Sequence, residues 1–75
     1  MLERIEINPH VCAGKPVIRG TRIPVSVILD ELEAGESWSS ILTGHPQLQQ
    51  EDIQEAIRFA KLSIEFTEIR VPAGK

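Results

Sequence analysis

The stretch GKPVIRGTRIPV, residues 14–25, concentrates positive charge in a chain whose formal net charge is −3 at pH 7. Three of the eight basic residues, Lys15, Arg19 and Arg22, lie within it, and residues 8–28 contain no Asp or Glu. Such side chains bind nucleic-acid phosphates, reach base edges or pair with a carboxylate on a partner protein. We therefore treat this segment as a candidate anion-binding clamp.

The two arginines also have a purely structural explanation. Like charges opposite each other on paired strands are unfavourable, but at an exposed turn the cost is only roughly a few tenths of a kcal/mol. The arginines then either solvate the turn or pair with acidic residues of the helix that follows. Those acidic residues are Asp30, Glu31 and Glu33. The sequence leaves both explanations open.

Motifs for catalysis or metal binding are incomplete in this chain. A Gly-Lys pair suggests a phosphate loop, but Pro9 stands at the upstream glycine position and Pro16 replaces the required Ser or Thr. His10 and Cys12 lack a third group to orient them, and together with His45 they are too few and too scattered for a structural zinc site. We expect a binding protein without metal or cofactor rather than an enzyme.

The length of the chain predicts a need for a partner. Seventy-five residues form a single domain, close to the lower limit for a self-sufficient core. The single cysteine excludes an internal disulfide, so burial against a second chain is the remaining way to add stability. We expect a homodimer or a hetero-complex. The start MLERIEINP has no apolar leader and no apolar run reaches membrane length, which predicts a cytoplasmic protein that does not enter a membrane.

The N-terminal third has the alternation and turn residues of β-structure. Residues 4–8 alternate in polarity and predict a short strand that ends at Pro9. Residues 17–24 predict a hairpin in which Gly20 occupies the first central position of a type II′ turn. The implied pairs are Arg19 with Arg22, Ile18 with Ile23, and Val17 with Pro24. The two arginines then share the exposed face, and a loop held by the prolines is the alternative.

Three helices are predicted from apolar spacing and end signals. The first runs over residues 24–34, between a proline that suits the first turn and Gly35. Ser37 caps a second, short helix over residues 38–42, in which Trp38 covers the core. The third runs over residues 50–64, and we expect its start to fray because glutamine is a poor N-cap. Its core stripe is Ile53, Ala56, Ile57, Ala60 and Ile64, with Phe59 and Phe66 beside it.

These elements define a mainly α fold: a three-helix, helix-turn-helix-like domain with a short N-terminal strand and a β-hairpin. A C-terminal strand is expected over residues 66–71, which alternate again. Residues 1–75 then form one domain. It divides into the strand and basic hairpin (1–24), the three-helix core (25–64) and a C-terminal strand or tail (65–75).

A family resemblance rests on the run NPHVCAGKPVIRGTRIPV, followed by ILDELEAGES, ILTGHP and EDIQEAIRFA. Over residues 8–62 the chain resembles the domain-of-unknown-function family 433, small bacterial and archaeal proteins described as VapB-type antitoxins. The resemblance implies a helix-turn-helix-like three-helix domain. It also implies a PIN-like nuclease toxin as the partner.

The third helix is the recognition helix that this fold implies. In a helix-turn-helix the second helix of the unit presents its N-terminal residues to base edges. Gln50 and Gln54 can contact adenine, whereas Glu51, Asp52 and Glu55 repel phosphate. We therefore expect the hairpin to contribute more than this helix to any DNA contact. The predicted binding residues are Lys15, Arg19, Arg22, Gln50 and Gln54.

Together these features predict an antitoxin-like protein that binds operator DNA as a dimer and neutralises a PIN-like nuclease. The alternative is a protein-interaction module without DNA binding, in which the hairpin arginines meet carboxylates of the partner protein.

Overall fold

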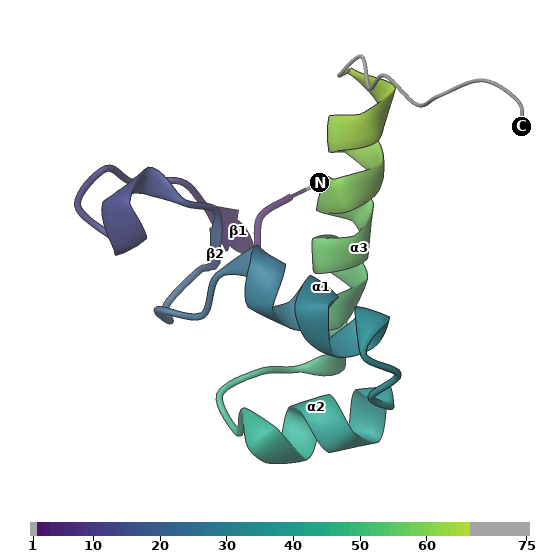
Figure 1. Cartoon of the computed structure of the whole chain (residues 1–75). Helices are drawn as coiled ribbons and strands as arrows, with labels where there is room; N and C mark the ends of the chain where they lie inside the picture. The colour runs from purple at the N-terminus through teal and green to yellow at the C-terminus, as the bar shows by residue number, and fades with distance from the viewer. Residues whose placement is uncertain (1, 67–75) are drawn as a thin grey trace, which may run out of the picture.

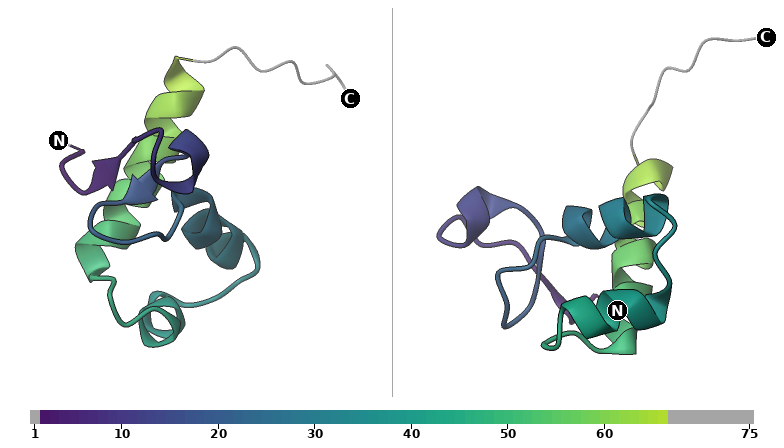
Figure 2. Two further views of the ribbon diagram at one scale, coloured as in Figure 1. Left: turned by 90° about the vertical axis from the view of Figure 1, so that its left-hand side faces the viewer. Right: turned by 60° about the horizontal axis from the view of Figure 1, so that its bottom comes forward.

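The computed structural model describes residues 2–66, and the chain is mainly helical, as predicted. A small antiparallel sheet and a loop lie to one side of three helices (Figures 1 and 2). In chain order the elements are β1 (Ile5–Glu6), the 3₁₀ turn η1 (Cys12–Gly14), β2 (Val17–Ile18), α1 (Val25–Glu33), α2 (Trp38–Gly44) and α3 (Gln50–Glu65). The strand expected over residues 66–71 falls, apart from Phe66, outside the described residues.

Helices α1 and α2 begin and end at the predicted signals. Pro24 immediately precedes α1, and Gly35 follows it with a φ of 89°. The N–H groups of Gly35 and Glu36 donate to the carbonyl oxygens of Leu32 and Glu31, which is the Schellman arrangement that a glycine in the left-handed region permits. Ser37 caps α2 by accepting a hydrogen bond from the backbone of Ser40 at 3.0 Å.

The hairpin after β2 forms, but with a different turn. Ile18 N–H donates to the carbonyl of Ile23, and Val17 bridges Pro24, as the predicted pairing requires. Thr21 N–H donates to the carbonyl of Ile18, so the turn spans residues 18–21 and Gly20 is its third residue, with a φ of 81°. A positive φ at the third position is the requirement of a type II turn. The predicted type II′ turn, one residue further on, is therefore wrong.

The β1 strand pairs with the other edge of β2, with Ile5 opposite Ile18 and Glu6 opposite Val17. This pairing buries Ile5 but ends at Glu6. Ile7, which we predicted on the same buried side, is 61 % exposed because it lies beyond the last strand residue.

The core is a single small cluster between the helices and the sheet. Its buried members are Ile5, Val17, Ile18, Val25, Ile28, Ile41, Leu48, Ile53 and Ala56. Trp38 and Phe59 pack against it from the edge, which confirms Trp38 as a core-covering residue. The core stripe predicted for α3 is only half right. Ile53 and Ala56 are fully buried, whereas Ile57 and Ile64 are exposed because α3 extends past the end of α1 (Figure 1).

One arginine joins the N-terminal segment to the start of α3. Arg4 Nη1 lies 2.9 Å from Oδ1 of Asp52, and its backbone N–H donates to Oε1 of Glu55 at 2.9 Å. Asp52 is the one buried charged residue among those described, with 4 % of its surface exposed. Because the guanidinium donates to this carboxylate, the pKa of Arg4 is raised above its ordinary value.

The same carboxylate caps α3. Oδ2 of Asp52 accepts the backbone N–H of Gln49 at 2.8 Å, and the side-chain oxygen of Gln49 accepts from Arg4 at 3.3 Å. We expected a weak helix start because glutamine caps poorly. Asp52, at the third helical position, supplies the missing acceptor instead.

Two further features complete the frame. Nε2 of His45 lies 2.8 Å from Oε2 of Glu31, which ties the end of α2 to α1. Within residues 2–66 no helix is long and apolar enough to span a lipid bilayer.

The Asp52 contacts predict a sharp difference between two neighbouring acidic residues. Asp52→Asn should lower the free energy of unfolding by about 1.5–3 kcal/mol, because it weakens two hydrogen bonds of a buried carboxylate, one of them to a cation. Glu51→Gln removes the same charge from an exposed neighbouring position and should cost less than about 1 kcal/mol. Urea unfolding followed by circular dichroism measures both. Equal losses would contradict a special role for Asp52.

Candidate nucleic-acid and partner interface

Arg19 is bonded to the backbone of the N-terminal segment. Its Nε donates to the carbonyl oxygen of Glu3 at 2.6 Å, and Nη2 donates to the carbonyl oxygen of Ile5 at 3.1 Å. Its own N–H donates to the carbonyl of Arg4 at 2.7 Å. The prediction that Arg19 faces Arg22 across the turn is therefore wrong. The guanidinium turns toward β1 because carbonyls at that strand offer acceptors, while Arg22 offers like charge.

Arg22 and Lys15 are exposed, and neither hydrogen-bonds through its side chain within residues 2–66. Arg22 lines a concavity of about 480 Å³ together with Gly20, Thr21 and Gln47. Gln47 belongs to the turn between α2 and α3, so the tip of the hairpin lies against that turn. Lys15 lies elsewhere, at the edge of a groove near the start of α1. The predicted clamp of three cations is therefore dispersed.

The loop before Lys15 has an unusual backbone. Cys12, Ala13 and Gly14 all have positive φ values, of 50°, 57° and 83°. Left-handed conformations cost non-glycine residues about 1–3 kcal/mol each and persist only where surrounding contacts impose them. Here Cys12 Sγ donates to the carbonyl oxygen of Arg22 at 3.6 Å, which attaches the loop to the hairpin. Cys12 thus has a packing contact rather than a catalytic partner.

One face of α3 carries amide and basic side chains. Gln50, Gln54 and Arg58 follow at intervals of four residues, with Lys61 beside them, and all four are exposed. Residues four apart lie on the same face of a helix. The structure thus brings the two predicted glutamines together with two basic residues that the sequence analysis missed. Their spacing from Gln50 was the signal that could have found them.

The acidic residues of α3 lie largely apart from that face. Asp52 is buried and Glu55 accepts the backbone N–H of Arg4, so both are occupied by the N-terminal segment. Glu51 remains exposed in the first turn. The predicted repulsion of phosphate by the helix start is therefore reduced, because one of its three carboxylates is ion-paired and a second is hydrogen-bonded.

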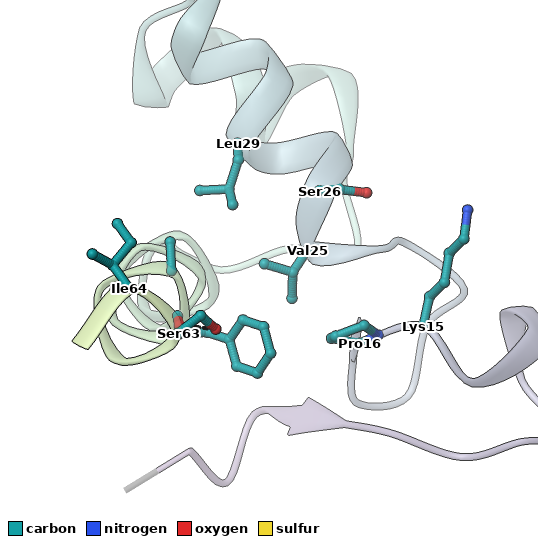
Figure 3. Close-up of a pocket in the computed structure, with 9 residues that line it drawn as sticks. Lys15, Pro16, Val25, Ser26, Leu29, Ser63 and Ile64 are labelled. Carbon is teal, nitrogen blue, oxygen red and sulfur yellow. Dashed lines mark hydrogen bonds between the residues drawn. The ribbon is translucent and has the colours of Figure 1, made fainter. Parts of the chain in front are cut away.

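An apolar groove forms on the opposite side of α3, near its C-terminal end. It has a volume of about 570 Å³ and is lined by Pro16, Val25 and Leu29 from one side and by Phe59, Ala60 and Ile64 from α3. Figure 3 shows Val25, Leu29 and Pro16 turned toward the shared opening, while the Lys15 ammonium points away from it. Among residues 2–66, no three His, Cys, Asp or Glu side chains are grouped so as to hold a metal ion.

The architecture is that of a small helix-turn-helix-like domain in which α2, residues 45–49 and α3 form the two-helix unit. A model of the family described as "Protein of unknown function (DUF433)" matches residues 5–60. The chain belongs to this family, in agreement with the resemblance noted in its sequence.

Two relatives support this membership. An uncharacterized protein, y4eO, from Sinorhizobium fredii (strain NBRC 101917 / NGR234) is 36 % identical over 59 residues, which cover 79 % of this chain. The chain spans only 27 % of the length of that protein. The crystal structure of a DUF433 member from Anabaena variabilis ATCC 29413 is 34 % identical, with a TM-score of 0.77, over 83 % of this chain and 61 % of that one.

The different surroundings of the two hairpin arginines predict different costs of removal. Arg19→Ala should lower the free energy of unfolding by about 0.5–1.5 kcal/mol, because it leaves two carbonyl groups without their donor. Arg22→Ala has the same charge change and no lost side-chain contact, and should stay within about 0.5 kcal/mol of the wild type. Chemical denaturation of the two variants side by side measures the difference. A larger loss for Arg22→Ala would contradict the assignment of Arg19 to β1.

Proposed function

We propose that this chain is an antitoxin-like binding protein that contacts operator DNA and neutralises a PIN-like nuclease. The role is one of binding rather than catalysis, and it places the protein in the cytoplasm with its DNA. The observation that supports DNA contact best is the sorting of charge on α3. Arg4 occupies Asp52 and Glu55, while Gln50, Gln54 and Arg58 stay exposed on another face.

This face has the chemistry of a major-groove surface. Glutamine can donate to and accept from adenine through its amide, and arginine contacts guanine or phosphate. The N-terminal half of the second helix is the part that enters the groove in a helix-turn-helix. Gln50 and Gln54 occupy that half of α3, which gives the helix the principal part in recognition.

The hairpin tip is positioned to add a phosphate contact. Arg22 lies beside Gln47 in the turn that leads into α3, so its free guanidinium is on the same end of the domain as the helix start. We expected the hairpin to dominate DNA contact. Because Arg19 is engaged by β1 and Lys15 lies apart, the proposal now assigns the hairpin one free cation.

A module that binds only protein is the second candidate. It is favoured by the acidic remainder of the surface, where Asp30, Glu33, Glu36 and Glu51 are all exposed. Such a surface repels nucleic acid at a distance. In this case Arg22 and Lys15 would pair with carboxylates of the nuclease.

Two arginine variants of equal charge test the proposal with a 60-base-pair duplex from directly upstream of the gene and a shuffled duplex of the same composition. Arg58→Ala should weaken binding to both and lower the slope of log affinity against log salt by about one. Arg22→Ala should do the same if its phosphate contact forms. Gln50→Ala with Gln54→Ala should instead erode the preference for the upstream duplex, by about 1–3 kcal/mol per lost base contact.

The outcomes separate the two candidates. Titrations that are flat for the wild type in low salt would remove the DNA half of the proposal. Co-purification with the product of the neighbouring gene then tests the other half, and its loss in a Lys15→Ala, Arg22→Ala variant would support the protein-only module. A neighbouring nuclease that stays fully active and unbound beside the wild-type protein would overturn the antitoxin role.

A further inference from the structure

The exposed apolar side chains of this domain gather at one place. Among residues 2–66 the exposed large hydrophobic residues are Ile7, Ile57, Ile64 and Phe66. Three of these four lie on α3 or at its end, beyond the part of the helix that α1 covers (Figure 1). The apolar groove opens beside them, so they form one continuous surface with Phe59 and Leu29. A contiguous apolar surface on a soluble domain marks an interaction site.

The spacing along α3 is that of a helix-pairing seam. Ile53, Ile57, Ala60 and Ile64 follow at intervals of four, three and four residues, which average close to the 3.5-residue repeat of two helices packed side by side. Ile53 is buried within the domain, and the seam continues outward from it. Ala60 is the smallest of the four side chains, and a small residue at a crossing point lets two helices approach closely.

We infer that the C-terminal half of α3 and the adjoining groove bind a second copy of this chain, with the two α3 helices antiparallel across a two-fold axis near Ala60. A two-fold interface must be self-complementary, so that each residue meets its counterpart's partner. Antiparallel pairing near Ala60 brings Ile57 of one copy close to Ile64 of the other, and the reverse. It also places each copy's Ile64 at the other copy's groove.

Charge supports a second copy rather than a foreign chain. Lys61 and Glu65 border the seam on its outer side, and neither has an ion-pair partner within residues 2–66. In the antiparallel arrangement Lys61 of one copy lies within about one helical turn of Glu65 of the other, at both symmetric positions. The surface is thus complementary to itself in charge as well as in apolar content. This inference does not depend on DNA binding.

The full-length chain, free of DNA, provides the test by sedimentation equilibrium over a range of micromolar concentrations. The wild type should dimerise, and Ile64→Glu should raise the dissociation constant by about tenfold or more, because it buries a charge in the interface. Glutamate favours helix, so α3 remains intact. Ile7→Glu is the matched control, since Ile7 is 61 % and Ile64 60 % exposed and Ile7 lies on the N-terminal segment. It should leave the dissociation constant unchanged.

A charge exchange tests the orientation. Lys61→Glu and Glu65→Lys should each weaken the dimer, roughly threefold at low salt, because each places like charges together across the axis. The double exchange should restore wild-type affinity. A wild type that stays monomeric throughout would overturn the inference and leave the groove to a foreign partner. A dimer that Ile64→Glu does not weaken, or that Ile7→Glu weakens equally, would also overturn it.

Discussion

The ion pair between Arg4 and Asp52 is the interaction on which the rest of the domain depends. It joins the first strand to the start of the last helix, two segments that are 48 residues apart in sequence. A buried carboxylate is unfavourable unless it is paired and hydrogen-bonded, and Asp52 has both an arginine and a backbone N–H as donors. The sheet and α3 therefore cannot separate without exposing an unpaired charge to the core.

The same interaction determines which charges face outward. Because Arg4 draws Asp52 and Glu55 toward the N-terminal segment, the opposite side of α3 presents amides and cations. Arg19 acts in a parallel way on the other side of the sheet, where its guanidinium bonds to backbone carbonyls. An acidic chain thereby acquires a local surface suited to nucleic acid, although two of its arginines are used internally.

The small size of the domain explains the groove on the other side of α3. Helix α3 has 16 residues, while α1 has nine, so a core formed by the three helices cannot cover the whole apolar side of α3. The first half of that side is buried with Ile53 and Ala56, and the second half meets no neighbour within the chain. Partner burial, which the length of the chain already made necessary, has a defined surface in this overhang.

Local features of this fold were predictable from the sequence, and long-range ones were not. The bounds of α1, the Ser37 cap and the Val17–Pro24 pairing depend on residues within a few positions of one another, where proline, glycine and serine have known geometry. The alternation of Ile5 and Ile7 predicted two buried residues, but the sheet ends between them. Only the tertiary structure decided that Arg4 binds Asp52 and that Arg19 turns from Arg22 to β1. An arginine can reach any acceptor that the fold brings within its length, and sequence spacing does not contain that distance.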